Sequence, residues 1–372
     1  MVQRAIDAYP QFAQIFDDWT PHRSISALYK DDFDCGEAPS MWEDFINYVF
    51  NLLSEHPACH TEAESMPDFW TEEAPCNVLA LNEASSEPWL VQTSAEVSRL
   101  ASIVQVEPLT YCPSLEYRYS AASVALRFLH AIPSSCRNEV RNVVLHEDCE
   151  SIANAASHGR GFISLCRSNQ RLRVRRIVDI WSTVLRARPD SQADYILRSE
   201  SRRGIDSMED DRLFSSTITK AVGAWIIEAQ ALSLLGMPQD SFSVLLDCTP
   251  TLEHTSTVFK IVQQDIAWQL ALDAAYARGL LPTPSWYKRR TCAGYQYERL
   301  PAAIRDMSTW NGPISCNFDP GAPVDVESVL ELYRGWSLQQ WQLSWDWHQP
   351  HSFQTEDPLP PWHVLKWLRV ML

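Results

Sequence analysis

Apolar residues recur every three or four positions along much of this chain, and this spacing is typical of amphipathic helices. The runs that are long enough for several helical turns cover residues 42–53, 172–187, 216–235 and 255–278. Ser40 and Glu43 form a capping-box pattern before the first run, and Gly236 follows the third run where helices commonly end. The pattern therefore predicts a mainly helical protein.

Two further helices are expected on either side of Pro133, over residues 122–131 and 134–146. In the second helix, Val140, Val143 and Val144 would face inward. The chain has only 11 glycines, which argues against Gly-rich phosphate loops and against a sandwich built on tight turns. The predicted fold class is mainly α, an irregular multi-helix globular fold with few or no short strands. At most one short strand is expected, at 77–81.

Composition divides the chain into two regions. Residues 1–120 are an acidic N-terminal region of helices plus a Pro/Glu-rich loop at 54–92, with 20 Asp/Glu against 5 Lys/Arg. Residues 121–372 are expected to form a helical core with an Arg-rich segment and Trp-rich C-terminal helices, interrupted by a charged hinge at 198–212.

The net charge of −16 disfavours binding to nucleic acids and to anionic membranes, because both require a positive surface. No apolar run is long enough to span a bilayer, and no secretory signal is visible. The ten cysteines are irregularly spaced without a C-x-x-C pair, which is typical of reduced thiols. We therefore expect a cytoplasmic or nuclear protein without a membrane or nucleic-acid partner.

Positive charge is concentrated in one segment of this acidic chain, since residues 160–190 contain eight arginines and two aspartates. One explanation is a docking patch for an acidic protein partner or a phosphate. The other is intramolecular pairing with the acidic N-terminal region, which the complementary charge totals favour. On the first explanation, the partner-binding residues are Arg137, Arg141, Arg160, Arg171, Arg173 and Arg175.

Four side chains in the same region are candidate zinc ligands: His146, Cys149, His158 and Cys166. Imidazole and thiolate groups can close a tetrahedral structural site. Their spacing matches no standard zinc finger, however, and Cys166 lies among apolar neighbours, where a free cysteine behaves as a small hydrophobic residue. We therefore expect these four residues to be packing residues, and we predict no metal or cofactor.

Signals for an enzyme are weak. The chain lacks G-x-S-x-G, a Walker lysine loop, H-E-x-x-H and G-x-G-x-x-G. His146-Glu147-Asp148 and Cys59-His60 bring reactive groups together in sequence only. The large aromatic residues near the C-terminus are expected to pack in the core or, if exposed, to anchor an interface; they are Trp336, Trp341, Trp345 and Trp347.

Ile132-Pro133, followed by Arg137, Val140 and Val144, resembles the opening of fungal F-box-like domains, although Ser135 and Cys136 replace the usual acidic residue and leucine. A longer stretch, about residues 120–350, is similar to a family of filamentous-fungal proteins with no known activity. It contains LRFLHAIPSSCRNEVRNVVLHEDCESIA and HGRGFISLCRSNQRLRVRRIVDIW. The F-box-like resemblance implies binding of a ubiquitin-ligase core subunit through residues 132–145. The fungal family supplies no activity, cofactor or site residue.

The leading hypothesis is an intracellular helical protein-interaction or scaffold module, whose working surface lies around residues 137–188. The alternative is an accessory enzyme with a helical pocket in which His146 or His158 acts with a carboxylate or with Cys166. A nucleic-acid binder is disfavoured by the net charge.

Overall fold

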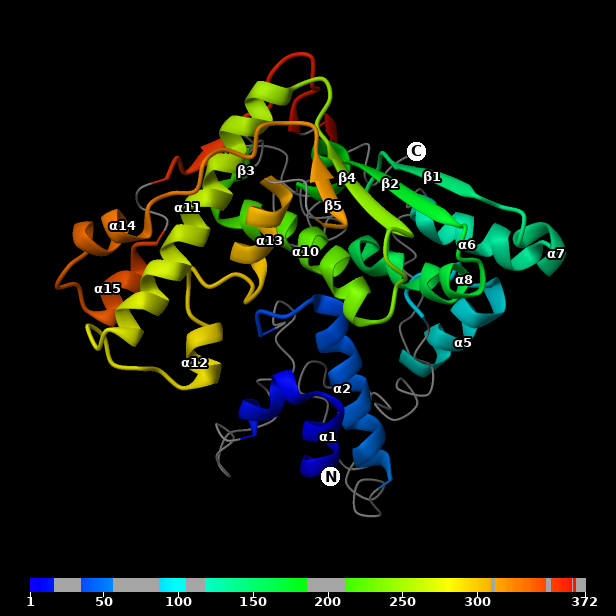
Figure 1. Cartoon of the computed structure of the whole chain (residues 1–372), viewed down its shortest axis with the longest axis horizontal. Coiled ribbons are helices and arrows are strands. Elements are labelled where there is room, and N and C mark those ends of the chain that lie inside the picture. The colour runs from blue at the N-terminus through cyan, green and yellow to red at the C-terminus, as the bar shows by residue number, and fades with distance from the viewer. Residues whose placement is uncertain are drawn as a thin grey trace.

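The computed structural model describes residues 1–16, 35–55, 87–104, 118–185, 212–308, 312–345, 349–362 and 364–365. Its centre is a four-stranded parallel sheet in the order β1-β2-β4-β5 (Figure 1). The four strands are β1 (Asn142–Glu147), β2 (Arg173–Asp179), β4 (Phe242–Asp247) and β5 (Ile314–Cys316). A small antiparallel sheet pairs β3 (Leu213–Phe214) with β6 (Ser352–Phe353). The prediction of a mainly α fold with few or no strands is therefore wrong, and the fold is mixed α/β.

Two of the predicted helices are largely strands. The expected helix at 134–146 is a single turn, α7 (Ser134–Arg137), followed by β1. The expected helix at 172–187 is β2 followed by a π-helical turn, η4 (Ile180–Val184). Both segments contain several valines, and the second also contains isoleucines; their branched side chains suit a pleated strand. Pairing with a parallel neighbour, as between Val143 and Val174, overrides their helical spacing. The possible strand at 77–81 and most of the charged hinge lie outside the described residues.

Every connection in the parallel sheet advances to the next strand in the same direction. The connecting helices are η3 (Ala155–Phe162) and α8 (Ile163–Ser168), then α10 (Ser215–Leu234), then α11 (Leu252–Ala277), α12 (Trp286–Arg290) and α13 (Leu300–Ser308). Right-handed connections that always advance one way place their helices on one side of a sheet. Figure 1 shows α8 and α10 on that side, together with α6 (Ala121–Ala131), which precedes β1.

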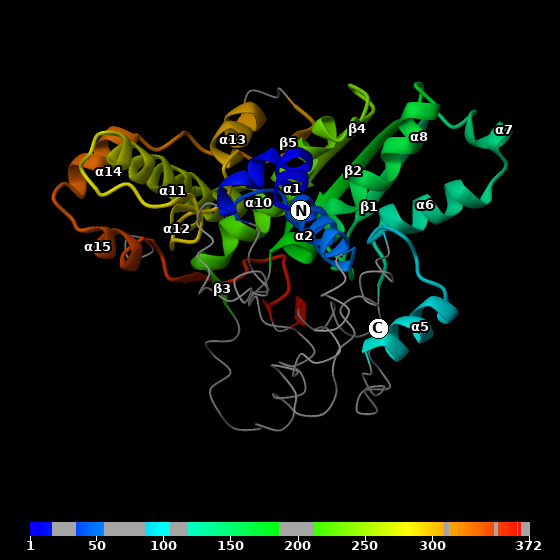
Figure 2. The ribbon, with the colours of Figure 1, turned by 90° about the horizontal axis from the view of Figure 1, so that it is seen from below.

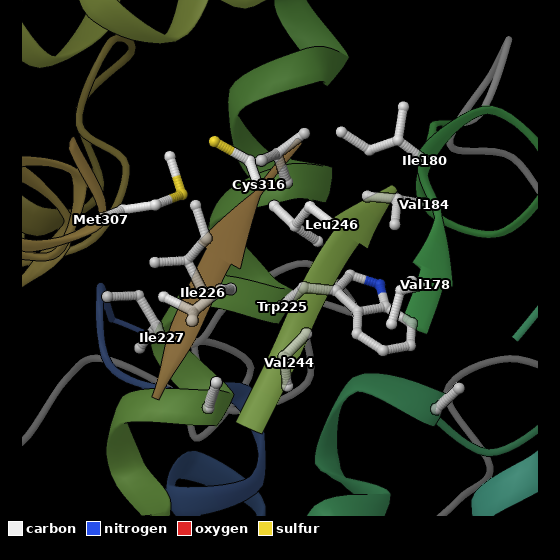
Figure 3. Close-up of a cluster of buried hydrophobic side chains, with 14 of the residues drawn as sticks. Val178, Ile180, Val184, Trp225, Ile226, Ile227, Val244, Leu246, Met307 and Cys316 are labelled. Atoms are coloured by element: carbon white, nitrogen blue, oxygen red, sulfur yellow. The ribbon is translucent and has the colours of Figure 1, made fainter. Parts of the chain in front are cut away.

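The main core lies between the sheet and α10 (Figure 3). Val178 and Leu246 of the sheet are fully buried and belong to the same cluster as Trp225 and Ile226 of α10. Burying a side chain of this size stabilises the fold by about 1.5–3 kcal/mol. The strands are therefore held mainly by what packs against this one face.

A buried ion pair joins β1, β2 and α6. The Arg176 guanidinium lies 2.6 Å from the Glu147 carboxylate and 4.9 Å from the centre of the Trp225 ring. The same carboxylate accepts hydrogen bonds from the backbone N–H groups of Ala121 (2.8 Å) and Ala122 (3.2 Å). These donors begin α6 and would otherwise lack partners, so Glu147 fixes the start of the helix over the sheet.

The far end of α11 packs against α14 (Val326–Leu332) and α15 (Leu338–Leu343). Trp341 is buried there, with its ring 4.7 Å from Trp268 and 5.4 Å from Tyr333. Trp336 and Trp345 are half-buried against the same cluster, and Trp347 lies outside the described residues. Within the described residues, the tryptophans near the C-terminus therefore pack in a core.

The N-terminal elements form a separate aromatic cluster around Phe12 and Phe45. They are α1 (Val2–Ala8), η1 (Pro10–Ile15) and α2 (Pro39–Ser54); α5 (Ser94–Val104) follows them in the chain. The predicted capping box at Ser40 is not formed, because α2 begins at Pro39 with Ala38 as its N-cap, which places Ser40 inside the first turn. The Ser40 N–H and hydroxyl donate instead to Glu228 of α10, at 2.6 and 2.7 Å.

The helices of the described ranges include none with the length and apolar character needed to cross a membrane.

Candidate interaction face of the parallel sheet

The two faces of the parallel sheet differ sharply in burial. On β2, Val174, Arg176 and Val178 are buried beneath the helices, whereas Arg173 and Arg175 are exposed. The alternation continues on the neighbouring strands, because side chains along a strand point to opposite faces in turn. Parallel sheets are normally covered on both faces. Here the face away from α10 is partly exposed along its whole length, and we call it the open face.

The strand register sets the order of side chains on the open face. From the N-terminal to the C-terminal ends of the strands, they are Asn142 and Arg173; Val144, Arg175 and Ser243; His146, Ile177, Leu245 and Ser315; and Asp179 and Asp247. Val144 is 55% exposed, so its predicted inward position is wrong. The open face is therefore basic at one end, apolar and neutral in the middle, and acidic at the other end.

Hydrogen bonds of the Asn169 side chain join the backbone segments that carry the arginines of the basic end. The side-chain amide of Asn169 donates to carbonyls at and just after the end of α7, including those of Arg137 (3.4 Å) and Val140 (2.9 Å). Its side-chain oxygen accepts from the N–H of Arg171. The N–H of Arg173 in turn donates to the carbonyl of Arg141 at 2.7 Å. Arg141, Arg171 and Arg173 thus lie at the start of β1 and β2, with Arg137 at the end of α7, and Arg175 follows on the open face.

Most of these arginines have no acidic partner in the described part of the chain. Arg141 pairs with the exposed Glu139 at 3.0 Å. No carboxylate of a described residue lies within ion-pair distance of Arg171, Arg173 or Arg175. Within the described residues, pairing with the acidic N-terminal region therefore accounts for none of these three arginines.

Arg160 is separate from the group and does pair with the N-terminal region. Its guanidinium lies 2.5 Å from Asp44 of α2, donates to the carbonyl of Ser40, and lies 5.4 Å from the centre of the Trp89 ring. Its side chain is only 13% exposed. Arg160 therefore joins two parts of the chain and is not available as a contact residue.

The acidic end of the face is held by local hydrogen bonds. Asp247 accepts from the Thr249 N–H at 2.9 Å and from the Asn317 side chain at 2.5 Å. Burial acts to raise the pKa of Asp247, but these hydrogen bonds outweigh it and hold the pKa below its usual value. Asp179, opposite Asp247 in the register, has a raised pKa because burial disfavours its charged form, with a smaller contribution from the charge of Asp247. Hydrogen bonds from Ser182 partly oppose that rise.

The four candidate zinc ligands are not brought together. His158 is buried, and its Nδ1 lies 2.7 Å from the Ser120 hydroxyl and 3.0 Å from the Ser123 hydroxyl. Its Nε2 lies 2.6 Å from the carbonyl of Ala153. Burial disfavours the charged ring and lowers its pKa to about 4, although the hydrogen bond with the Ala153 carbonyl acts in the opposite direction. His158 is thus a neutral structural residue.

The other three candidates lie in different surroundings. Cys166 is buried in the main core, where burial raises the pKa of its thiol to about 11. His146 lies on the open face, and Cys149 is half-buried beyond the end of β1. Among the described residues, no group of three His, Cys, Asp or Glu side chains could hold a metal ion.

Asp179 and Asp247, which make the far end of the open face acidic, were not among the residues predicted from the sequence. The buried partnership of Glu147 and Arg176 was not predicted either. The available signal was the alternation in RVRRIVD and NVVLHE, which is that of half-buried strands. That alternation separates Arg173 and Arg175 from Arg176.

No protein-family model, curated protein or solved structure matches this chain.

Proposed function

We propose that this protein is a protein-interaction module whose open face binds an extended acidic segment of a protein partner at its arginine end. The observation that carries the proposal is the exposure of Arg173 and Arg175 on the face of a parallel sheet, without acidic partners among the described residues.

Charged residues on an exposed surface are usually solvated and need no partner. The situation of these arginines is different, because they stand on a rigid strand rather than on a flexible loop. Arginine is also favoured at interfaces, since its planar guanidinium can bind a carboxylate through two hydrogen bonds. The geometry therefore supports a binding role more strongly than a solubilising one.

The gradient along the face restricts what the partner can be. The distance along β2 from Arg173 to Asp179 is about 20 Å, at about 3.3 Å per residue of a strand. A segment of similar length would place acidic residues beside Arg173 and Arg175, apolar residues over Val144 and Ile177, and a basic residue near Asp179. Complementary charge of this kind gives orientation and specificity.

Affinity capture from native cells tests the proposal. We compare the wild type with the double variant Arg173→Glu/Arg175→Glu and with Arg167→Glu, which reverses an exposed arginine of α8 outside the face. The proposal predicts that proteins with acidic segments are lost with the double variant and retained with the control. If the same proteins are captured at the same level by all three, with folding confirmed by circular dichroism, the proposal is wrong.

Binding of a ubiquitin-ligase subunit through residues 132–145 stays a separate prediction. It is distinguished by the same experiment, since it does not require Arg173 or Arg175. Of the groups named for the enzyme alternative, His158 is fully hydrogen-bonded and Cys166 lies in the core. His146 is exposed on the open face, so an enzyme that uses His146 with a carboxylate stays a separate prediction.

A further inference from the structure

The outer edge of β1 differs from the opposite edge of the same sheet. β5, at the far edge, is only three residues long, and very short edge strands are one way in which proteins avoid unwanted strand pairing. β1 is six residues long and contains no lysine or proline. β1 is therefore not protected from pairing with another strand by short length, lysine or proline.

The register identifies which backbone groups of β1 point outward. Because the Arg173 N–H donates to the Arg141 carbonyl, residues 141, 143, 145 and 147 direct their backbone groups toward β2. The intervening residues, Asn142, Val144 and His146, direct theirs away from the sheet. No hydrogen bond to these outward groups is found in the described part of the chain. All three residues are also exposed, so another strand can reach them.

We infer that β1 pairs with β1 of a second copy of this chain, in an antiparallel arrangement about a two-fold axis at Val144. Two-fold dimers are the commonest soluble oligomers, and a two-fold axis perpendicular to the strands makes the two edges antiparallel. This register forms about six backbone hydrogen bonds, because three residues of each strand face three of the other. It would join the two open faces into one continuous surface.

Charge complementarity favours this occupant. In this register Val144 lies opposite Val144 of the second copy, and Asn142 lies opposite His146. No two permanently charged side chains of the same sign are therefore paired across the interface. The antiparallel direction brings the N-terminal flank of β1, with Arg141, next to the C-terminal flank of the second copy, with the exposed Asp148. An edge-to-edge pair in the opposite direction would bring like flanks together.

A second observation comes from α6, which Figures 1 and 2 show beside β1 at the outer end of the sheet. Two of its apolar side chains, one helical turn apart, are strongly exposed: Val124 is 55% and Phe128 is 61% exposed. Contiguous exposed apolar residues are typical of interaction sites. The same end of the molecule thus offers an unpaired strand edge and an apolar helix surface.

Light scattering coupled to size exclusion, over a roughly hundredfold range of concentration, tests the inference, because assembly of a dimer depends on protomer concentration. We expect a dimer for the wild type and for Val144→Thr, which keeps an uncharged β-branched residue. Val144→Lys places like charges opposite each other and should weaken the dimer by roughly tenfold or more. Val324→Lys, an exposed valine before α14, is the control and should dimerise like the wild type.

Hydrogen exchange of the unmodified protein gives an independent readout. The amides of Asn142, Val144 and His146 should exchange slowly at concentrations where the dimer forms and rapidly at concentrations where it dissociates. A monomer at every concentration overturns the inference. So does a dimer in which these three amides exchange as fast as in the monomer, and so does a folded Val144→Lys variant that dimerises as tightly as the wild type.

Discussion

Arg175 and Arg176 are consecutive residues of β2 whose side chains lie on opposite faces of the sheet. Arg176 is 1% exposed and pairs with Glu147, whereas Arg175 is exposed among the side chains of the open face. Two residues of the same type, adjacent in the chain, therefore have different roles: one holds the fold together and the other is available to a partner.

The first prediction concerns the stability of these two positions. Arg176→Ala leaves the Glu147 carboxylate buried without its partner, and we expect it to lower the free energy of unfolding by about 3–5 kcal/mol. Arg175→Ala should change it by less than about 0.5 kcal/mol, as for most surface substitutions. Denaturant unfolding followed by circular dichroism measures both. Equal losses of unfolding free energy for the two variants would contradict the finding that one face of the sheet is buried and the other exposed.

A second matched pair tests the same alternation on β4. Leu246 is fully buried against α10, and Leu246→Ala should cost about 2–5 kcal/mol of unfolding free energy because it leaves a cavity. Leu245 lies half-buried on the open face, so Leu245→Ala should cost clearly less. Thermal or denaturant unfolding of the two variants gives the comparison. A larger loss for Leu245→Ala would show that Leu245, and not Leu246, points into the core.

A third prediction concerns pH, because two buried groups act in opposite senses. Burial lowers the pKa of His158 from 6.5 to about 4, so its contribution to stability is lost as the pH falls through that window. Burial raises the pKa of Glu228 from 4.5 to about 7, so its contribution is lost as the pH rises through that window. The two effects should largely offset each other between pH 4.5 and 6.5 in the wild type.

Glu228→Gln removes the titrating carboxyl group of Glu228 and leaves the pH effect of His158. Relative to the wild type, its free energy of unfolding should rise by up to about 3 kcal/mol between pH 4.5 and 7, at about 1.4 kcal/mol for each unit of pKa difference. Urea unfolding at several pH values measures the difference, and Glu139→Gln, at an exposed position, should follow the wild type. Parallel profiles for the wild type and Glu228→Gln would show that Glu228 does not titrate with a raised pKa.

The two arginines also show how far the sequence could predict the structure. The long helices were predicted well where the apolar spacing extends over many turns, as in α10 and α11, which agree closely with the expected 216–235 and 255–278. Short strands such as β2 were missed, because its apolar positions 174, 177 and 178, with Ile180 directly after the strand, fit a helical spacing as well as an alternating one. Only pairing with β1 and β4 decides between the two.

For the candidate site too, some features were predictable from the sequence and others were not. The positive charge of Arg171, Arg173 and Arg175 was visible in the sequence, and its concentration in one region is real. The partnership of Arg160 with Asp44, and the position of Asp247 beside Asp179, depend on contacts across 116 residues and between separate strands. Such contacts become visible only once the order of the strands is known.

A charge-swap binding experiment tests most directly whether the arginines of the open face recognise an acidic segment. The probe is a fluorescent peptide of about seven residues, matched to the length of the open face, with glutamates at one end, valines in the middle and lysines at the other end. We expect salt-dependent binding to the wild type, a loss of roughly tenfold or more with Arg173→Glu/Arg175→Glu, and recovery of binding to this variant when the glutamates of the peptide are replaced by lysines. Equal binding of both peptides to both proteins would contradict the claim that the arginines of the open face recognise an acidic segment.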